Sequence, residues 1–333
     1  MNDEVKRDQR SKAFDESGRL NLSAMVLVVL CCALWGGNSV AVKFTVSQIP
    51  PIGCAGIRFF LSLGLIAFWC RIEGTSLRLT REQFIPVVNN AWLLFVQMAA
   101  FNWGTLHTHA GRSSVFINVH PFVVAPLAWL WLREPISWRS VLGLVLAGGG
   151  VALLFDQPDY TEGASLVGDL AVLLSGAMIG VMMTYQKRLL RSFRPNHLLF
   201  WQLALAVPLF AGYSLATERL DAYHFNAQSV LGLAYQSLLV SGFCFIAWMS
   251  LLRRYPANQL AAFGFLTPFF GIASARVLLG EPMRQSLIGG CALVGWGLFL
   301  VSRPARPKMA IDLSDSNSKP LLGSNEAIAP ESR

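Results

Sequence analysis

The sequence has few charged residues. Only 14% of its 333 residues are Asp, Glu, Lys or Arg, whereas 54% are hydrophobic, and a soluble globular protein carries about a quarter charged residues. The missing charge is absent from long blocks: residues 20–42 contain none, and a helix that crosses a bilayer needs about 20 apolar residues. The pattern excludes an ordinary soluble domain and predicts an integral membrane protein.

Residue types that bind metals or carry out catalysis are also scarce. The chain has 19 acidic, six cysteine and five histidine residues, and no cysteine stands at a metal-ligand spacing from a histidine. We interpret the cysteines as small buried hydrophobic residues. No Gly-x-x-x-x-Gly-Lys-Ser/Thr motif is present, so ATP is not the direct driver. We expect no cofactor, no metal and no enzymatic activity. A membrane-embedded enzyme or cofactor protein stays as an alternative; it would need acids, Cys or His clustered at one depth.

Ten apolar segments predict ten transmembrane helices and an all-α integral membrane fold. Residues 1–21 and 303–333 are expected to be cytoplasmic tails, the second of them disordered, and residues 156–167 an outer loop. The predicted helices are Leu22–Val42, Ile52–Trp69, Phe84–Asn102, Ser113–Leu132, Trp138–Phe155, Gly168–Tyr185, His197–Ala216, Gln228–Leu252, Ala257–Leu279 and Ser286–Val301.

Loop charges predict the orientation. Of the 27 Lys and Arg residues, 21 fall in segments on the side of the N-terminus and three in loops on the other side. Cytoplasmic loops carry the excess of positive charge, so we expect a multi-pass protein of the cell (inner) membrane with both termini cytoplasmic. These loops also account for the net charge of +8, and we expect a lipid bilayer and a small-molecule substrate as partners but no nucleic acid. A homodimer is an open alternative.

One four-residue sequence pattern occurs twice in the chain. Leu132-Arg133-Glu134-Pro135 returns as Leu279-Gly280-Glu281-Pro282, 147 positions later, and acids and prolines are scarce enough to make this match informative. It predicts two repeats, 22–155 and 168–302. Because five spans per repeat is an odd number, the second repeat must enter the membrane from the opposite side, and inverted repeats can expose a central site alternately to each side. The same offset relates Gly143 to Gly290, Gly150 to Gly297, Ala110 to Ala257 and Pro121 to Pro268.

Short motifs recur in order along the two repeats. They are Trp35-Gly36-Gly37-Asn38, Lys43, Arg58-Phe59, Ala110, Pro121 and Leu132-x-Glu134, followed by Ala257, Pro268 and Gly280-Glu281-Pro282. With these motifs the chain resembles EamA domains of the drug/metabolite transporter superfamily over about residues 23–302. The resemblance implies a ten-helix transporter, often an exporter of amino acids or other small metabolites, although uptake members exist. The second repeat departs from the pattern: Ile179-Gly180 stands where Trp-Gly would, and Gln202 replaces Arg58.

Two features mark the membrane interior. Arg58 lies about 10 Å into its span at 1.5 Å per residue, and such a group normally faces protein or a water-filled cavity. It is either a counter-charge for a substrate carboxylate or a structural donor to helix-end carbonyls. Pro121 and Pro268 interrupt related spans, and we expect these two broken helices to face a transport cavity. His120 either lines that cavity, where it could couple transport to protons, or bonds a neighbouring helix as a neutral group.

Other side chains could complete a mostly apolar binding site with a few placed polar groups. The predicted substrate-binding residues are Trp35, Asn38, Arg58, Gln97, Asn102, Asn118, His120, Tyr185, Gln236, Trp248 and Thr267.

Two other sets of residues are predicted to be structural. Glu134 and Glu281 are expected to cap the helices that their following prolines open. The glycines of 143–150 and 289–297 are expected to let the fifth and tenth helices pack closely.

The sequence thus predicts a secondary transporter of small metabolites that works by alternating access, with export of amino acids or their derivatives favoured. An uptake carrier of the same fold for a phosphorylated or nucleotide-linked compound is the alternative. It would need several basic residues at mid-depth, where only Arg58 qualifies.

Overall fold

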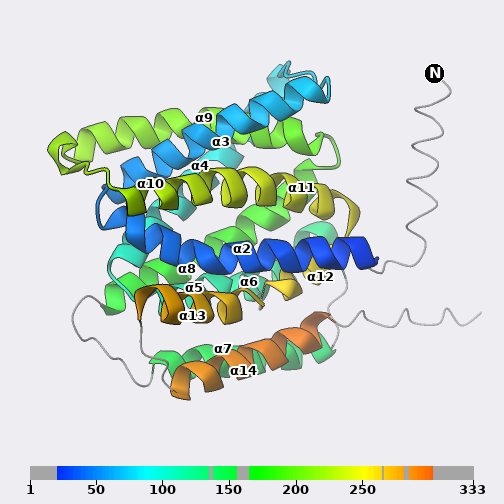
Figure 1. Ribbon diagram of the computed structural model, residues 1–333. Coiled ribbons are helices and arrows are strands. Elements are labelled where there is room, and N and C mark those ends of the chain that lie inside the picture. Colours follow the sequence, from blue (N-terminus) through cyan, green and yellow to red (C-terminus); the bar gives the residue numbers. More distant parts are fainter. Residues whose placement is uncertain (1–20, 135–137, 156–164, 265, 281–284, 303–333) are drawn as a thin grey trace, which may run out of the picture.

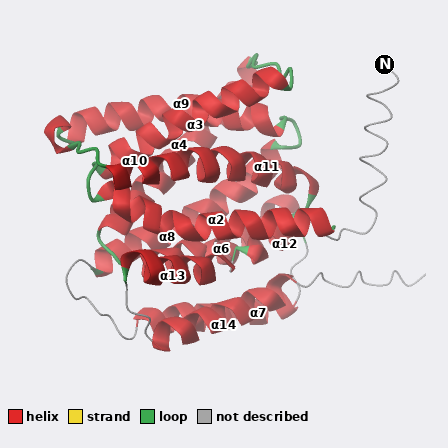
Figure 2. Ribbon diagram, in the orientation of Figure 1, coloured by secondary structure: helices red, strands yellow, loops and turns green. Residues whose placement is uncertain are grey.

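The computed structural model describes residues 21–134, 138–155, 165–264, 266–280 and 285–302, and the elements in these ranges are helices (Figure 2). The two predicted tails, apart from residue 21, and most of the predicted outer loop lie outside the described residues. The helices are α2 (Leu22–Val46), α3 (Pro51–Ile72), α4 (Arg81–Leu106), α5 (Ala110–Phe116), η1 (Ile117–Val119), α6 (His120–Leu127), η2 (Ala128–Leu132), α7 (Trp138–Phe155), α8 (Leu166–Leu189), α9 (Pro195–Thr217), η3 (Leu220–Ala222), α10 (Ala227–Ala234), η4 (Tyr235–Cys244), α11 (Phe245–Arg254), α12 (Ala257–Phe263), α13 (Leu266–Leu279) and α14 (Gln285–Ser302).

Eight helical segments of the described residues are long and apolar enough to cross a bilayer. Five are the single helices α2, α3, α4, α8 and α9. The other three, Ala110–Leu132, Ala227–Arg254 and Ala257–Leu279, each join several consecutive helices. The helices α7 and α14, of 18 residues each, occupy the two remaining predicted spans. The all-α membrane fold is therefore confirmed, and each predicted span coincides with a helix or helix series whose ends lie within four residues of the prediction.

Several helix starts follow directly from the local sequence. Asn21 accepts a hydrogen bond from the Ala24 N–H, Thr80 and Gln83 form a reciprocal capping box at the start of α4, and Asn226 caps α10. These side chains bond backbone N–H groups that have no partner inside the helix. The helices α3 and α9 instead begin with a proline, which has no N–H to satisfy.

Helices of the two repeats pack against one another in pairs. The contacts join α3 with α9, α4 with α8, α2 with α13, and α7 with α14. In Figure 1 α3, α4 and α9 lie at one side of the bundle, α7 and α14 form a layer at the other, and α2 runs between them. The helices of the two repeats thus pack into one shared interior, and the repeats do not form two separate bundles.

The pairing of α7 with α14 uses the repeated glycines. Gly143 and Gly150 are buried on α7, and their counterparts Gly290 and Gly297 are buried on α14. Glycines seven residues apart lie on one face of a helix, and small residues let two helix backbones approach closely in a membrane. The predicted close packing of these two helices is confirmed.

Hydrogen bonds to two carboxylates connect the ends of α3 with the ends of α9. We call the end of the bundle that holds Leu22 and Ser302 the terminal end. At the opposite end, Glu218, which follows α9, accepts hydrogen bonds from the Ile52 and Gly53 N–H groups of α3, each at 2.8 Å. An acidic group at a helix N-terminus meets the positive end of the helix dipole. At the terminal end, Glu73, which follows α3, accepts from the Asn196 side chain at the start of α9.

The loop beside Glu218 carries its own polar contacts. The Tyr223 hydroxyl lies 2.5 Å from the Ser214 hydroxyl oxygen, and burial raises the pKa of the Tyr223 phenol. Asp221 is exposed and accepts from Arg219, which lowers the pKa of that carboxyl. The half-buried tyrosine therefore belongs to the contacts between α3 and α9, whereas the exposed pair is a surface feature.

Two lysines cap helix C-termini in equivalent positions of the repeats. Lys43 Nζ, near the end of α2, donates to three carbonyl oxygens in and just after the last turn of α4, the nearest being Thr108 O at 2.6 Å. Lys187 Nζ on α8 donates to Leu252 O and Tyr255 O at the end of α11, both at 2.7 Å. A cation is stabilised by the unpaired carbonyls at a helix C-terminus, so both lysines hold helix ends in place.

Glu134 differs from its predicted role. We expected it to cap the helix that Pro135 opens, but its carboxylate accepts from the Ala257 and Asn258 N–H groups of α12, at 3.3 and 3.4 Å. The capping chemistry is the predicted one, but the capped helix belongs to the other repeat, because the paired helices bring α12 within reach of the end of η2. Its counterpart Glu281 lies outside the described residues.

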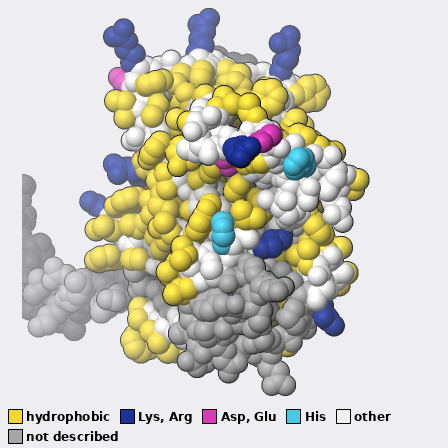
Figure 3. Space-filling view, turned by 90° about the vertical axis from the view of Figure 1, so that its left-hand side faces the viewer, with side chains coloured by type: hydrophobic (Ala, Val, Ile, Leu, Met, Phe, Trp, Pro, Cys, Tyr) yellow, Lys and Arg dark blue, Asp and Glu magenta, His cyan; other side chains and the backbone are white. Residues whose placement is uncertain are grey.

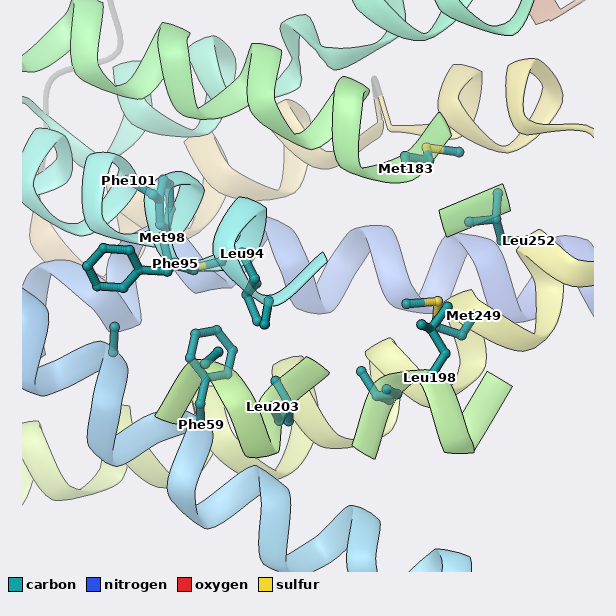
Figure 4. Close-up of a cluster of buried hydrophobic side chains, with 14 of the residues drawn as sticks. Phe59, Leu94, Phe95, Met98, Phe101, Met183, Leu198, Leu203, Met249 and Leu252 are labelled. Atoms are coloured by element: carbon teal, nitrogen blue, oxygen red, sulfur yellow. The ribbon is translucent and has the colours of Figure 1, made fainter. Parts of the chain in front are cut away.

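The interior between α3, α4 and α9 is apolar. Figure 4 shows Leu94 of α4 pointing toward Phe59 of α3, with Leu203 of α9 beside Phe59. The Phe210 ring lies 5.5 Å from the Phe59 ring and 5.0 Å from the Phe95 ring, measured between centroids. Lipid tails are as apolar as these side chains, so close packing holds the helices together more than exclusion from water does.

The outside of the bundle is apolar as well. Large hydrophobic side chains such as Trp138 and Val277 are 75% and 80% exposed. In the space-filling view hydrophobic side chains cover much of the visible described surface, and Lys and Arg stand at a few points (Figure 3). Such a surface is stable in contact with lipid chains, which agrees with a membrane location.

The crossing of α2 with α13 generates a stability prediction. A Cβ added at Gly36 would lie 2.4 Å from Phe270 Cβ and 2.9 Å from the Gly271 backbone nitrogen. We expect Gly36→Ala to lower the free energy of unfolding by about 1–3 kcal/mol, the usual cost of overpacking. Gly64→Ala is the matched control, because nothing lies within 4 Å of the added methyl group. Thermal unfolding of the purified protein in detergent measures both; equal midpoints would contradict the crossing.

Candidate functional site

A central cavity of about 150 Å³ lies between the two repeats. Both repeats contribute to its walls, and its lining combines aromatic rings and methionines with a few polar side chains. Its volume is below the roughly 300–1,000 Å³ of pockets for drug-sized ligands, which suits a small metabolite. The lining residues are Trp35, Asn38, Ser39, Arg58, Gln97, Met98, Phe101, Ile117, Asn118, His120, Ile179, Met182, Met183, Gln186, Gln202, Val240, Phe245, Trp248, Met249, Gly264 and Thr267.

Eight of the eleven predicted substrate-binding residues lie in this lining. The structure brings them together from six of the predicted spans, although they are spread over more than 200 positions of the sequence. Their contact with a substrate stays a prediction. The eight are Trp35, Asn38, Arg58, Gln97, Asn118, His120, Trp248 and Thr267.

The other three predicted residues lie outside the cavity lining and hold helices to one another. The Asn102 side chain donates to Pro51 O at 2.9 Å, and the Tyr185 hydroxyl donates to Pro86 O at 3.2 Å. Gln236 donates to the Thr45 hydroxyl at 2.6 Å. Each side chain is turned toward a neighbouring helix, because a polar group buried in apolar surroundings is costly unless it is hydrogen-bonded.

Arg58 is the charged group of the cavity. Its side chain is 1% exposed, and among the described residues of the lining it is the one that carries a charge. Its Nε donates to the Ser241 hydroxyl at 2.5 Å, Nη1 lies 4.0 Å from Met98 Sδ, and the guanidinium carbon stands 5.3 Å from the centre of the Phe59 ring. These partners are all neutral, so the structure offers the guanidinium weak acceptors and no carboxylate among the described residues.

Two amide oxygens beside the cavity have no hydrogen-bond donor. Gln97 Oε1 and Asn38 Oδ1 are buried and unpaired, and these side chains are 1% and 7% exposed. The orientation of the Gln97 amide follows from its neighbour Ser175. The Ser175 hydroxyl uses its hydrogen to donate to the backbone carbonyl of Gln97, so its oxygen accepts from the side-chain Nε2 of Gln97 at 2.8 Å. The Gln97 oxygen is thereby left as an acceptor that an N–H group of a ligand could satisfy.

The second repeat places amides where the first has the arginine. Gln202 lies on α9 at the position that Arg58 occupies on α3, and its Oε1 accepts from Gln186 Nε2 at 3.2 Å. The amide of Gln202 reaches Met182 Sδ at 3.4 Å, which is a weak acceptor. The sequence had indicated Gln202 as the departure from the repeat pattern, whereas nothing in the sequence distinguished Gln186 from an ordinary helix residue.

Both interrupted spans reach the cavity. The helix of Ala110–Leu132 is broken at η1, where Asn118 has a non-helical backbone, and its Nδ2 donates to Ser114 O at 2.7 Å. Pro121 and Pro268 are both buried inside the bundle. The prediction that these two proline-containing spans face the centre of the molecule agrees with this placement.

His120 packs against the other interrupted span. A Cβ built at Gly264, between α12 and α13, would lie 2.7 Å from the His120 ring, so a larger residue there would displace the imidazole from this position. The ring nitrogen Nδ1 stands 3.5 Å from Ile117 O, at the limit of a hydrogen bond. Both of the interpretations that the sequence left open for His120 are compatible with this position, since the ring touches the second repeat and also lines the cavity.

Aromatic rings and methionines form the apolar part of the wall. The Trp35 and Trp248 rings, one from each repeat, meet edge to face with 4.8 Å between their centroids. Figure 4 shows Met249 beside Leu198, and Met98 among the phenylalanines of α4. Methionine adapts its shape to irregular partners. In the sequence these methionines could not be told from packing residues, because both occur on apolar helices.

A buried aspartate and an arginine form an ion pair at the end of the bundle opposite the terminal end. Arg112, before the break in the first repeat, forms an ion pair with Asp169 of α8, and Asp169 also accepts from the Thr108 hydroxyl at 2.5 Å. The Asp169 side chain is completely buried and that of Arg112 is 12% exposed. This pair links the two repeats to each other. It was not predicted, because Arg112 and Asp169 lie far apart in the sequence at the ends of different spans.

The cysteines take no part in a metal site within the described residues. Cys31, Cys32, Cys54, Cys70 and Cys244 are buried free thiols, and no described group of three His, Cys, Asp or Glu side chains could hold a metal ion. The side chain of Cys291 lies outside the described part of the chain.

A central cavity between inverted repeats of apolar helices is the geometry of a membrane carrier, and comparison with known proteins agrees. The EamA-like transporter family matches residues 22–156 and 166–303. The chain belongs to this family. The proteins to which it is similar include the uncharacterized transporter YoaV of Bacillus subtilis, 23% identical over 284 residues, which are 84% of this chain and 96% of YoaV.

Another relative has a more specific description. A probable amino-acid metabolite efflux pump of Salmonella typhimurium is 26% identical over 282 residues, 82% of this chain and 93% of the relative. One solved crystal structure matches with a TM-score of 0.69 and 15% identity over 85% of this chain and 97% of that one, and this likeness shows the fold. This EamA-like protein is therefore a multi-pass membrane protein of a transporter family.

The buried ion pair generates a second prediction. We expect Asp169→Asn to lower the free energy of unfolding by about 3–5 kcal/mol, because the substitution removes the completely buried carboxylate that pairs with Arg112 between the repeats. Asp221→Asn is the matched control: it removes another Arg–Asp pair, in which both side chains are exposed, and exposed pairs contribute little. Thermal unfolding in detergent compares the two. A midpoint for Asp169→Asn as high as that of the control would show that the ion pair does not hold the repeats together.

Proposed function

We propose that this EamA-like protein is a secondary carrier that exports a small metabolite, an amino acid or a derivative of one, by alternating access. The observation that carries the proposal is the central cavity, to which both inverted repeats contribute and which holds one buried arginine. Rocking of one repeat against the other would open the cavity to each side in turn.

The cavity supports an acidic substrate. A buried guanidinium with neutral partners is stabilised by a ligand carboxylate, because Arg binds carboxylates with two parallel hydrogen bonds. In this proposal Arg58 binds the carboxylate, and the methionines and tryptophans contact the side chain of the substrate. Amino acids and their derivatives have this chemistry, and the efflux pump of Salmonella typhimurium is named for amino-acid metabolites.

The alternative uptake of a phosphorylated or nucleotide-linked compound has less support. A phosphate group carries up to two charges and is usually bound by several basic residues or backbone N–H groups. The described lining supplies one arginine, and a cavity of about 150 Å³ is small for a nucleotide. A membrane-embedded enzyme would need clustered acids or metal ligands, and the described lining has neither.

We also propose that the terminal end faces the cytoplasm. The end of the bundle that holds Leu22 carries exposed basic side chains in the last turns of helices and in the loops that follow them, such as Arg188, Arg191 and Arg253. The cytoplasmic ends of transmembrane helices and their loops are enriched in such residues. Export would then begin with the cavity open at this end.

The transport proposal is tested in proteoliposomes. Purified protein is reconstituted, loaded with unlabelled amino acids or derivatives, and assayed for counterflow of the labelled compound, with and without a pH gradient. We expect counterflow of at least one carboxylate-bearing compound. Absence of counterflow for every compound of the panel would contradict the carrier proposal.

Arg58 gives the matching mutational prediction. Arg58→Gln installs the residue that the second repeat has at the equivalent position, and we expect it to lower the counterflow rate at low substrate concentration about 100-fold, as loss of one partner of a buried charge pair does. Arg276→Gln is the control, because this arginine is exposed on α13; its counterflow should equal that of the wild type. Carboxylate transport by Arg58→Gln at the wild-type rate would rule out the counter-charge role.

A further inference from the structure

We propose that the substrate is a small carboxylic acid whose nitrogen is an uncharged N–H, such as an N-acylated amino acid, and that it binds in preference to the zwitterionic amino acid. This inference rests on the carrier function proposed above and narrows its substrate class. It follows from the charge of the cavity lining and from the two unpaired amide oxygens beside it.

The first argument is charge balance. Arg58 is the charged side chain of the described lining, and its partners Ser241, Met98 and Phe59 are neutral. A monoanionic ligand brings the net charge of the filled cavity to zero. A zwitterion neutralises the guanidinium as well, but it introduces an ammonium group for which the described lining offers no carboxylate. A buried charge without an opposite charge is strongly disfavoured.

The second argument is the pair of orphaned acceptors. Gln97 Oε1 and Asn38 Oδ1 are buried, line the cavity and lack a donor, and Ser175 fixes the orientation of the Gln97 amide. An unpaired buried acceptor is costly, so a ligand that donates one N–H gains the hydrogen bond and removes this cost. An amide N–H next to a carboxylate supplies this donor without adding a charge.

The third argument is the apolar wall. The methionines at positions 98, 182, 183 and 249 and the rings of Phe101, Trp35 and Trp248 line the remainder of the cavity. Such a surface accommodates an aliphatic or aromatic side chain and an acyl group, but it offers little to a second charged group. The combination of one cation, unpaired acceptors and apolar walls matches an acylated apolar amino acid.

The test uses ligands that share a side chain and differ in charge. N-acetyl-leucine, leucine and leucine amide carry charges of −1, 0 and +1, and the same three forms of methionine and phenylalanine complete the panel. Binding to the full-length protein in detergent is measured by calorimetry and exchange by counterflow in proteoliposomes. We expect the acetylated form to bind at least about tenfold more tightly than the free amino acid, which corresponds to about 1.4 kcal/mol, and the amide not to bind.

A fourth ligand tests the N–H. N-acetyl-N-methyl-leucine keeps the charge and the acyl group but has no N–H, and we expect its affinity to fall about tenfold relative to N-acetyl-leucine, the effect of leaving a buried acceptor unpaired. Equal affinity for the two compounds would overturn the role of Gln97 and Asn38 as acceptors for the ligand.

The variants separate charge from shape. In Arg58→Gln we expect the affinity for N-acetyl-leucine to fall about 100-fold and the preference for the acetylated form over leucine to disappear, whereas Arg276→Gln keeps the wild-type ratio. The wild-type ligand series decides the proposal by itself if Arg58→Gln does not purify as a single species.

The outcomes also separate this inference from the carrier function. Tighter binding and faster exchange of free amino acids than of their acetylated forms would overturn the inference and leave the carrier function intact; the Trp35 and Trp248 rings would then be the groups that hold the ammonium. No binding and no exchange of any compound in the panel would overturn both.

Discussion

The structure depends on the need to satisfy backbone polar groups in apolar surroundings, where an unpaired N–H or carbonyl is costly. The two repeats meet this need for each other. Glu218 caps α3 and Glu134 caps α12 across the repeat boundary, and Lys43 and Lys187 bind the carbonyls at the ends of α4 and α11. The two glutamate caps come from the opposite repeat, whereas each lysine caps a helix of its own repeat. The starts of α3 and α12 are therefore complete only when both repeats are present.

The same constraint explains where the cavity lies. The hydrogen bonds that carboxylates form between the repeats lie at the two ends of the bundle, while the middle contains the interrupted span at Asn118 and the unpaired amide oxygens of Gln97 and Asn38. Arg58 and Gln97 are held there by packing and by bonds to neighbouring helices, with Ser241 and Ser175 as their partners. In the proposed transport cycle, the polar groups of the centre would bind the ligand, and the contacts at the ends would break for the cavity to open.

Much of this arrangement is readable from the sequence, for definite reasons. The spans follow from the scarcity of charge, and the inverted repeats follow from one Glu-Pro pattern written twice with an odd number of spans between. Arg58 and Asn38 could be proposed as cavity residues because polar groups in a membrane face protein or water. That argument does not distinguish a cavity from a helix–helix contact, which is why Asn102 and Gln236 were proposed with them and instead bond neighbouring helices.

Other features need coordinates. The ion pair of Arg112 with Asp169 and the cap that Glu134 places on α12 join residues distant in sequence, and the spacing of residues says nothing about such contacts. The methionines of the cavity wall have the same pattern as packing residues, since both lie on apolar helices. The sequence therefore does not reveal the partner of each polar group. That partner decides whether the group holds two helices together or is left without a hydrogen bond in the cavity.

The central claim is that the cavity between the repeats opens to both sides of the membrane in turn. The most direct measurement places a single cysteine at Ser39, a cavity residue that is 2% exposed, in a variant whose native cysteines are replaced by alanine and whose counterflow is retained. Oriented vesicles are then treated with a membrane-impermeant maleimide from one side or the other. The account predicts labelling from either side and protection by a transported substrate; labelling from one side only, or from neither, would contradict it.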